Sequence, residues 1–370
     1  MEKVIVVGAS VAGGFTAYNL AKHFDVEIIE EHNHFKKTCS GILTDPVNDL
    51  IKIKKSTIDN KIKNFRIYSP NNNFLEIKLK KPDIIFNREK LNEYIVDMAV
   101  KKGATLKQET QFKGIESNKI ILNYKNSNRS IKSNYLIGAD GSLSTVAKST
   151  GIFTNREFFI AAKAITKMKH DNTISVYPFY GCFSWVVPRN EEEIEIGTMS
   201  HYNDAQAFSR FLSKFNSKII SKEASIIPIY NPKIKTYTNF KGINTYLVGD
   251  AATMAKATTG GSIMQSLAAS KILADSIISN KDYESAWKKE IGNKLNLHLN
   301  IRKVIDKFND KDWNSLVKSL KDKKLIDILE SKSRDNPEFV FEMILKKPSL
   351  LKFSKVLLRN HKNPRQKISK

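Results

Sequence analysis

The stretch Lys3–Gly14, KVIVVGASVAGG, decides the fold of this 370-residue chain. It predicts a buried strand over Lys3–Val7, then a glycine-rich turn, then a helix through Ala12–His23. A second strand is predicted at Val26–Ile29, directly before Glu30. In this β-α-β order the turn presents a helix N-terminus, with its free N–H groups, to the pyrophosphate of a dinucleotide.

The turn carries small residues where a pyrophosphate must approach the backbone, at Gly8, Ser10, Ala12 and Gly13. Ser10 stands where the dinucleotide fingerprint has its middle glycine, and its side chain is small enough to point away from the pyrophosphate. Glu30 lies 22 positions after Gly8, about where an acid accepts hydrogen bonds from ribose hydroxyls. These features predict a dinucleotide site, and they do not separate FAD from a nicotinamide nucleotide.

Two later predicted strands also end in glycine and aspartate. Gly138-Ala139-Asp140-Gly141 follows one of them, and Gly249-Asp250 follows the other. A glycine-rich run and a helix to Ile278 come after the second. Taken singly, Asp140 and Asp250 are also explained as turn residues or helix caps. In this order behind the first loop, the motifs indicate one extended dinucleotide held by three loops.

The chain predicts an α/β fold with an α+β insertion, because the nucleotide-binding pieces are not contiguous. A Rossmann-like domain is expected to be interleaved with an antiparallel-sheet substrate domain, and a helical region with a basic tail to follow. The expected ranges are 1–60, 84–152 and 240–280 for the first domain, 61–83 and 153–239 for the second, and 281–370 for the helical region.

Composition limits the function classes. The chain holds 61 basic and 38 acidic residues, a net charge of +23, with 41% apolar residues, which is typical of a soluble globular protein. Its two cysteines form no CxxC pair and its seven histidines show no ligand spacing, so no metal site is predicted. No apolar run approaches the roughly 20 residues of a membrane span. A cytoplasmic location is therefore expected.

The end of the chain is locally basic. Residues 351–370 contain seven lysines and arginines and no acid. In an α-helix Leu350, Phe353 and Leu357 would form one apolar stripe beside these charges, which is typical of a peripheral membrane anchor at the inner membrane face. The alternative is that the stripe packs on the protein and leaves a solvated tail.

The order of the glycine and aspartate motifs resembles the flavoprotein hydroxylase superfamily, the p-hydroxybenzoate hydroxylase type, over roughly residues 1–280. The resemblance implies FAD, with its pyrophosphate on the first loop and near Asp140. It implies the adenosine ribose on Glu30 and the ribityl chain on Gly249 and Asp250. Arg88 is similar to the flavin-contacting arginine of that superfamily, and a solvated charge at a helix start is the alternative.

Three segments resemble the geranylgeranyl reductase family. Lys37-Thr38-Cys39-Ser40-Gly41 is similar to its Lys-x-Cys-small-Gly loop, and Phe183–Pro188 to its Tyr-x-Trp-x-Phe-Pro motif. Lys256–Ile263 is similar to its flavin loop, with Ala257 in place of a proline. The flavin loop would contribute Thr259, Gly260, Gly261, Ser262 and Ile263.

The resemblance implies Cys39 beside the flavin and Trp185 at the substrate as catalytic candidates. Four aromatic side chains would line an apolar tunnel: Phe179, Tyr180, Phe183 and Trp185. The structural alternatives are a small loop residue for Cys39 and ordinary sheet core for the aromatics.

The implied reaction is FAD-dependent reduction of carbon–carbon double bonds in geranylgeranyl or other isoprenoid chains of a lipid, with hydride from N5 of the reduced flavin. An aromatic hydroxylase or monooxygenase on the same scaffold is the first alternative. A basic membrane- or nucleic-acid-binding protein with a vestigial flavin fold is the second. NAD(P)H and ferredoxin both stay open as electron donors, and no specific nucleic acid is expected as a partner.

Overall fold

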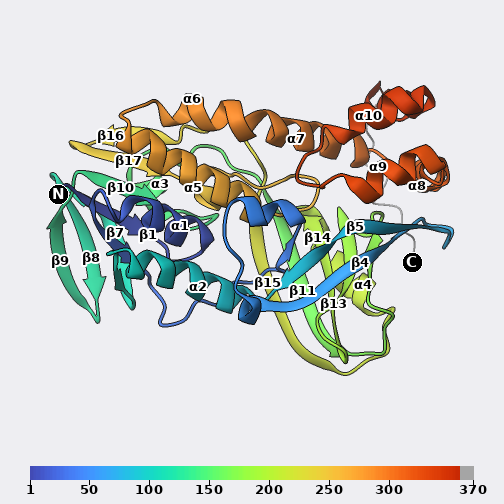
Figure 1. Cartoon of the computed structure of the whole chain (residues 1–370), viewed down its shortest axis with the longest axis horizontal. Helices are drawn as coiled ribbons and strands as arrows, with labels where there is room; N and C mark the ends of the chain where they lie inside the picture. The colour runs from blue at the N-terminus through green and yellow to red at the C-terminus, as the bar shows by residue number, and fades with distance from the viewer. Residues whose placement is uncertain (359–370) are drawn as a thin grey trace.

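The computed structural model describes residues 1–358, which form three sheets and a set of helices (Figure 1). The first sheet has the order β16-β17-β10-β1-β2-β6, and every neighbouring pair except β16 with β17 is parallel. Its strands are β1 (Lys3–Val7), β2 (Asp25–Ile29), β6 (Thr105–Lys107), β10 (Tyr135–Gly138), β16 (Tyr237–Phe240) and β17 (Ile243–Leu247). The apolar residues of β1 are fully or almost fully buried, as expected for a central parallel strand.

Helices and a small sheet pack on the parallel sheet. Helix α1 (Val11–Leu20) contacts both α2 (Arg88–Lys101) and α5 (Ile263–Ile278). Elsewhere α3 (Thr145–Ser149) contacts a three-stranded antiparallel sheet. That sheet is made of β7 (Thr110–Glu116), β8 (Lys119–Tyr124) and β9 (Ser127–Lys132). The apolar run 131–137 is divided between β9 and β10, which lie in different sheets.

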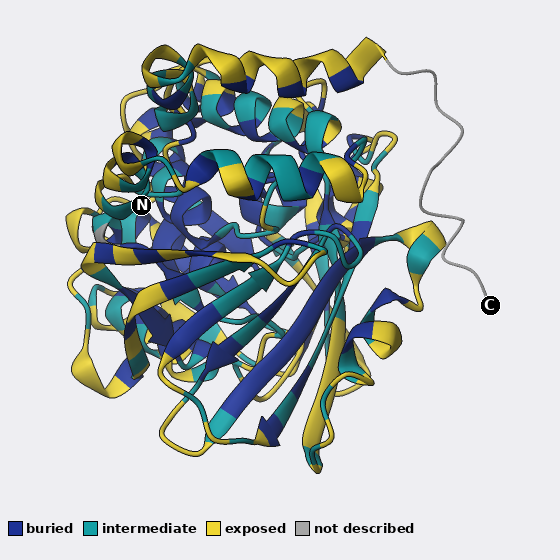
Figure 2. Cartoon of the chain, turned by 90° about the vertical axis from the view of Figure 1, so that its right-hand side faces the viewer, coloured by how far each residue is buried: buried dark blue, intermediate teal, exposed yellow. Residues whose placement is uncertain are grey.

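The large second sheet has the order β15-β11-β14-β13-β12-β4-β5-β3, and its pairs are antiparallel except β12 with β4. Figure 2 shows its long strands with buried residues running along them. The strands are β3 (Ile42–Leu43), β4 (Ile58–Tyr68), β5 (Phe74–Phe86), β11 (Phe158–Lys167), β12 (Thr173–Tyr177), β13 (Phe183–Pro188), β14 (Glu193–His201) and β15 (Ile219–Pro228). Strands β4 and β5 pair as an antiparallel hairpin around the polar turn Pro70–Asn73.

The described chain after residue 282 is helical and lies along one side of both sheets (Figure 1). Its helices are α6 (Tyr283–Trp287), the π-helical turn η5 (Lys288–Gly292), α7 (Asn293–Ile305), α8 (Asp310–Leu320), α9 (Lys323–Ser331), α10 (Phe339–Lys346) and the 3-10 helix η6 (Pro348–Leu358). Side chains of α8, α9 and η6 share one apolar core with β4 and β5. The remaining short elements are η1 (Asp45–Asp49), η2 (Lys55–Thr57), η3 (Tyr202–Asp204), α4 (Ala207–Leu212) and η4 (Gly249–Ala252).

The apolar stripe near the end of the chain contains Val356 where the prediction has Leu357. Leu350, Phe353 and Val356 are buried in the core, whereas Leu357 is 46% exposed. The reason is that η6 is a 3-10 helix, which repeats every three residues rather than every 3.6. The rest of the basic tail, 359–370, lies outside the described residues. Within residues 1–358 no helix has the length and apolar character to cross a membrane.

Candidate functional site

The loops that carry the sequence motifs leave the same edge of the parallel sheet. Strands β17, β10, β1 and β2 are consecutive neighbours, so the loops after them lie side by side. These loops begin with Val248, Ala139, Gly8 and Glu30, and Gly249 follows Val248. A hollow at this edge is lined by residues from the loops after β1, β2 and β10, among them Gly8, Ser10, Glu30, Asp140 and Lys37.

Two glycines make the first loop tight enough for a close approach. Gly8 has φ of +102°, and a Cβ atom there would lie 2.5 Å from the carbonyl oxygen of Ala139. A Cβ atom on Gly13 would lie 1.8 Å from the carbonyl oxygen of Gly8. Ser10 is the N-cap of α1 and makes no side-chain capping hydrogen bond. The first turn of α1 therefore suits an anion.

Glu30 and Asp140 both reach the hollow, but their carboxylates already have protein partners. Glu30 accepts the N–H of Ala9 at 2.8 Å, with its other oxygen near His32. Asp140 accepts the hydroxyl of Ser144 at 2.6 Å and the N–H of Val146 at 3.0 Å, so it braces the start of α3. Burial raises the pKa of Asp140. The N-cap of α3 is Ser144, and Asp140 supports that helix start through Ser144 and Val146.

Asp250 differs from these acids. Within the described chain, its buried Oδ1 atom has no hydrogen-bond partner. A buried acceptor of this kind calls for a ligand group, because an unpaired one is costly. Gly249, with φ of +68°, brings the loop against α1, since a Cβ atom there would lie 2.9 Å from Cβ of Ala12. A hydroxyl-bearing ribityl chain fits this acceptor, and FAD supplies one.

The loop before α5 is folded tightly. The N–H of Gly260 donates to the carbonyl oxygen of Lys256 at 2.8 Å, and the N–H of Lys256 donates to that of Gly261 at 3.0 Å. Ser262 is the N-cap of α5 without a side-chain capping bond, and Ile263 begins the helix. This 16-residue helix therefore presents open N–H groups beside the Asp250 loop, as a flavin edge requires.

Arg88 points into the protein. It begins α2 after the N-cap Asn87, and only 9% of it is exposed. Its Nη1 atom lies 3.7 Å from Sγ of Cys39, and its Nη2 atom donates to Asn92 at 3.2 Å. Nε of Arg88 is buried and finds no partner among residues 1–358. The alternative of a solvated charge at a helix start is therefore wrong.

The 37–41 loop joins the hollow to the second sheet. Lys37 lines the hollow, whereas the hydroxyl of Ser40 donates to Glu195 in β14. Gly41 has φ of +67°, and a Cβ atom there would lie 2.3 Å from the carbonyl oxygen of Phe86. The half-buried Cys39 lies between these two anchor points.

Glu195 is the centre of a buried polar network that the motifs do not reveal. It is 0% exposed, accepts the indole N–H of Trp185 at 2.9 Å and pairs with Lys163 at 3.2 Å. Burial alone would raise its pKa, but the charges of Lys163 and then Arg189 hold the pKa below its usual range. In the sequence Glu195 follows the three acids at 191–193 and looks like part of a charged turn, so no local signal marks it as buried.

The same cations hold the backbone of the 37–41 loop. Lys163 donates to the carbonyl oxygen of Cys39 at 3.1 Å, and Arg189 donates to that of Ser40 at 2.6 Å. The network thus fixes where Cys39 stands relative to the sheet.

The aromatic side chains predicted to line a tunnel divide between two apolar clusters. The indole ring of Trp185 lies against Gly197, where an added Cβ atom would be 2.2 Å from the ring. The ring centroids of Trp185 and Phe183 are 5.2 Å apart. Tyr180 instead packs 5.3 Å from Phe211 of α4 in a separate apolar cluster. The rings of Phe179 and Tyr180 are 4.9 Å apart, so the two clusters touch, and a tunnel lined by the four side chains stays a prediction.

Known proteins resemble this chain along nearly its whole length. Digeranylgeranylglycerophospholipid reductase of Methanosarcina acetivorans is 25% identical over 390 residues, which cover 92% of this chain and 95% of the relative. The reductase of the same name from Methanocaldococcus jannaschii is 26% identical, covering 96% and 98%. The crystal structure of a geranylgeranyl bacteriochlorophyll reductase-like protein from Thermoplasma acidophilum has a TM-score of 0.81 at 20% identity, covering 95% of this chain and 98% of that one, and it shares the fold.

The expected mixed fold is confirmed by this likeness, and the chain is an FAD-dependent oxidoreductase. The family model described as FAD binding domain matches residues 62–264, and the chain belongs to that family. Its distant homology is to the geranylgeranyl reductases.

Proposed function

We propose that this protein reduces carbon–carbon double bonds in the geranylgeranyl or other isoprenoid chains of a lipid. The proposal rests on the position of the 37–41 loop, which links the cofactor hollow to the inner polar network of the second sheet. It is supported by the two reductases that match nearly the whole chain. When bound, FAD would supply hydride from N5 of its reduced ring.

The chain's own residues would hold the cofactor and position the substrate. Gly8, Ser10, Ala12, Gly13 and Glu30 form the first loop and its acid. The rest of the proposed cofactor set is Arg88, Asp140, Gly249, Asp250, Thr259, Gly260, Gly261, Ser262 and Ile263. Cys39 would stand on the substrate side of the cofactor and Trp185 on the sheet below, with Glu195 holding both in place.

Mass spectrometry of the product tests the proposal. The FAD-loaded protein is reduced with dithionite without oxygen and incubated with a digeranylgeranylglycerol phospholipid. We expect the lipid to gain the mass of one hydrogen molecule for each double bond reduced, and oxidised protein to leave it unchanged. A lipid that stays unchanged with reduced protein, together with oxygen-dependent hydroxylation of an aromatic compound, would favour the monooxygenase alternative.

The electron donor is tested in the same preparation. We propose NAD(P)H or reduced ferredoxin, and anaerobic stopped-flow spectroscopy measures how fast each bleaches the flavin absorbance. The donor that reduces the flavin at least as fast as turnover is the physiological class, and a donor that is slower than turnover is excluded.

We also propose that the C-terminal region lies against the anionic inner face of the membrane. Leu345 and Leu351 are 80% and 52% exposed beside lysines, and residues 351–370 carry seven basic groups. Each such group contributes about 1 kcal/mol near an anionic surface. Flotation with anionic liposomes should be stronger for the full chain than for a chain ending at Leu358, and should fade at high salt. Equal flotation of both chains would contradict the anchor.

A further inference from the structure

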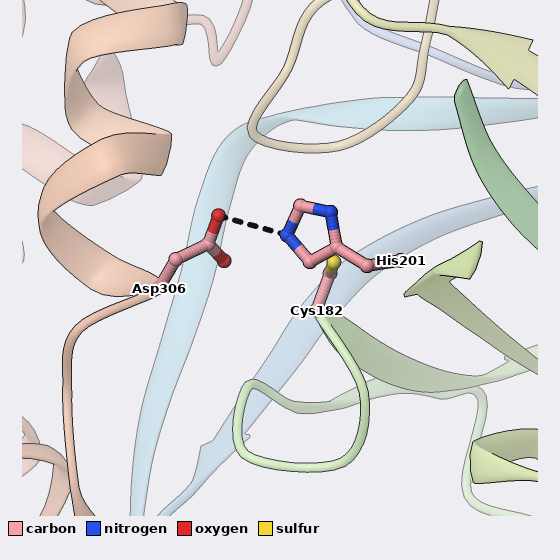
Figure 3. Close-up of side chains that lie close together, drawn as sticks. All are labelled: Cys182, His201 and Asp306. Carbon is pink, nitrogen blue, oxygen red and sulfur yellow. Dashed lines mark hydrogen bonds and ion pairs between the residues drawn. The ribbon is translucent and has the colours of Figure 1, made fainter. Parts of the chain in front are cut away.

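Three side chains of metal-ligand type meet at one end of the second sheet (Figure 3). Cys182 lies in the turn before β13, His201 ends β14, and Asp306 follows α7. One sulfur, one ring nitrogen and one carboxylate oxygen lie within 4.8 Å of one another. Across residues 1–358 this is the one such group of three, and none of its members belongs to the proposed cofactor set.

The distances suit a single small cation. Nε2 of His201 and Oδ2 of Asp306 are 3.0 Å apart. With bonds of about 2.0–2.2 Å, two ligands of a tetrahedral zinc ion lie about 3.3 Å from each other. These two atoms would need to move apart by only a few tenths of an ångström to bind one ion, and the sulfur of Cys182 lies within 4.8 Å of both (Figure 3). Thiolate, imidazole and carboxylate are all ligands that zinc accepts.

Arg302 orients two of the three groups from behind. Its Nη1 atom donates to Oδ1 of Asp306 at 2.9 Å and to the carbonyl oxygen of Cys182 at 3.2 Å. Its other N–H groups donate to the carbonyl oxygens of Ala257 and Thr258 at 3.1 and 3.0 Å. With Oδ1 engaged in this way, Oδ2 of Asp306 is left to face His201. Outer contacts that orient the ligands are typical of built metal sites.

The exposure of the three side chains to solvent indicates what size of ligand can reach them. Cys182 is 1% exposed, which excludes a bulky substrate at the thiol. The side chains of His201 and Asp306 are 43% and 24% exposed, so the group opens to solvent on that side. A metal ion and one water molecule can enter by this route.

We propose that Cys182, His201 and Asp306 bind one zinc ion, with water as the fourth ligand. Binding releases the thiol proton of Cys182 and displaces the proton held between His201 and Asp306, and both protons pass to solvent. The ion would tie the turn before β13 and the end of β14 to the end of α7. The proposal does not depend on the reductase function.

Metal stoichiometry and local structure test the site. The FAD-bound full chain, made without a polyhistidine tag, is incubated with zinc chloride and a thiol-free reductant and then dialysed. We expect one zinc ion per chain by mass spectrometry, with one sulfur neighbour at about 2.3 Å in the zinc X-ray absorption spectrum. Cys182→Ser and Asp306→Asn should lose the ion. Cys39→Ser, which removes the other free cysteine, should keep the ion and its sulfur signal.

FAD content and melting temperature without zinc show whether each variant folds. If Cys182→Ser does not fold, His201→Gln serves instead, because that side chain is partly exposed. Zinc retained equally by the wild type and by the ligand variants overturns the proposal. So does a wild type that binds no zinc, or a spectrum without a sulfur neighbour.

Discussion

At the scale of single residues, Asp250 carries the most direct test of the cofactor site. Its buried Oδ1 atom is unpaired within residues 1–358, so its removal should weaken ligand binding more than folding. A hydrogen bond to a charged acceptor is worth about 1.5–3 kcal/mol. We expect Asp250→Ala to raise the Kd for FAD roughly ten- to a hundredfold in fluorescence titrations of the apoprotein. Asp250→Asn, which keeps one acceptor, is the matched control. An unchanged Kd would make Asp250 a turn residue only.

Cys39 should matter for turnover and not for cofactor content. The protein holds the loop here through the carbonyl oxygen of Cys39, which accepts from Lys163, so loss of the thiol leaves that anchor intact. We expect Cys39→Ala to keep its FAD and to lose most prenyl-reductase turnover, measured by product mass. Normal turnover in this variant would make Cys39 a structural loop residue.

At the scale of elements, the 37–41 loop depends on Glu195 in β14. Glu195→Gln keeps the shape and removes the charge that Lys163 and Arg189 face. We expect the free energy of unfolding to fall by about 1.5–3 kcal/mol, since hydrogen bonds to a charged group are lost. Chemical denaturation followed by circular dichroism measures this change. Lys163→Met added to Glu195→Gln should cost less than the sum of the two single changes, and strict additivity would argue against the network.

Helix α7 carries a buried histidine that makes stability depend on pH. Burial lowers the pKa of His298 from 6.5 to about 3. The Nδ1 atom of His298 lies 2.8 Å from the hydroxyl oxygen of Thr258. The unfolded chain therefore binds one more proton between these pH values, so stability falls as the pH drops below about 6.5, by at most about 1.4 kcal/mol per pH unit. We expect the melting temperature to fall more steeply from pH 7.5 to 5 in the wild type than in His298→Gln. Parallel profiles for the two proteins would contradict this assignment.

At the scale of the whole molecule, the C-terminal helices complete the core of the second sheet. Phe308 is 2% exposed, and its ring centroid lies 5.0 Å from that of Trp313 and 5.6 Å from that of Phe353. We expect Phe308→Ala to destabilise the protein by about 3–5 kcal/mol, as measured by denaturation. Leu357→Ala, at an exposed position of the same region, should change stability little. Equal small effects of both would mean that these helices pack independently of the sheet.

Local patterns predict the parallel sheet well and the links between the sheets poorly. The strand Lys3–Val7, the glycine turn and the later aspartates follow from periodicity and backbone geometry close to each residue. The contact of Ser40 with Glu195 joins positions 155 residues apart, and no local pattern encodes it. The register of η6 was also out of reach, because its 3-10 geometry depends on packing against the core. The sequence therefore predicts the glycine-rich loops of the parallel sheet better than the Glu195 network that joins the two sheets.

The strand order β17-β10-β1-β2 also determines when the cofactor can bind during synthesis. Strand β1 spans Lys3–Val7 and β17 spans Ile243–Leu247, so β1 is synthesised long before β17 and Asp250. Until then the nascent chain exposes one side of β10, an unpaired strand edge open to aggregation. Capture of the cofactor by all these loops therefore requires synthesis to pass residue 250, and a nascent chain that stops earlier lacks the Asp250 loop.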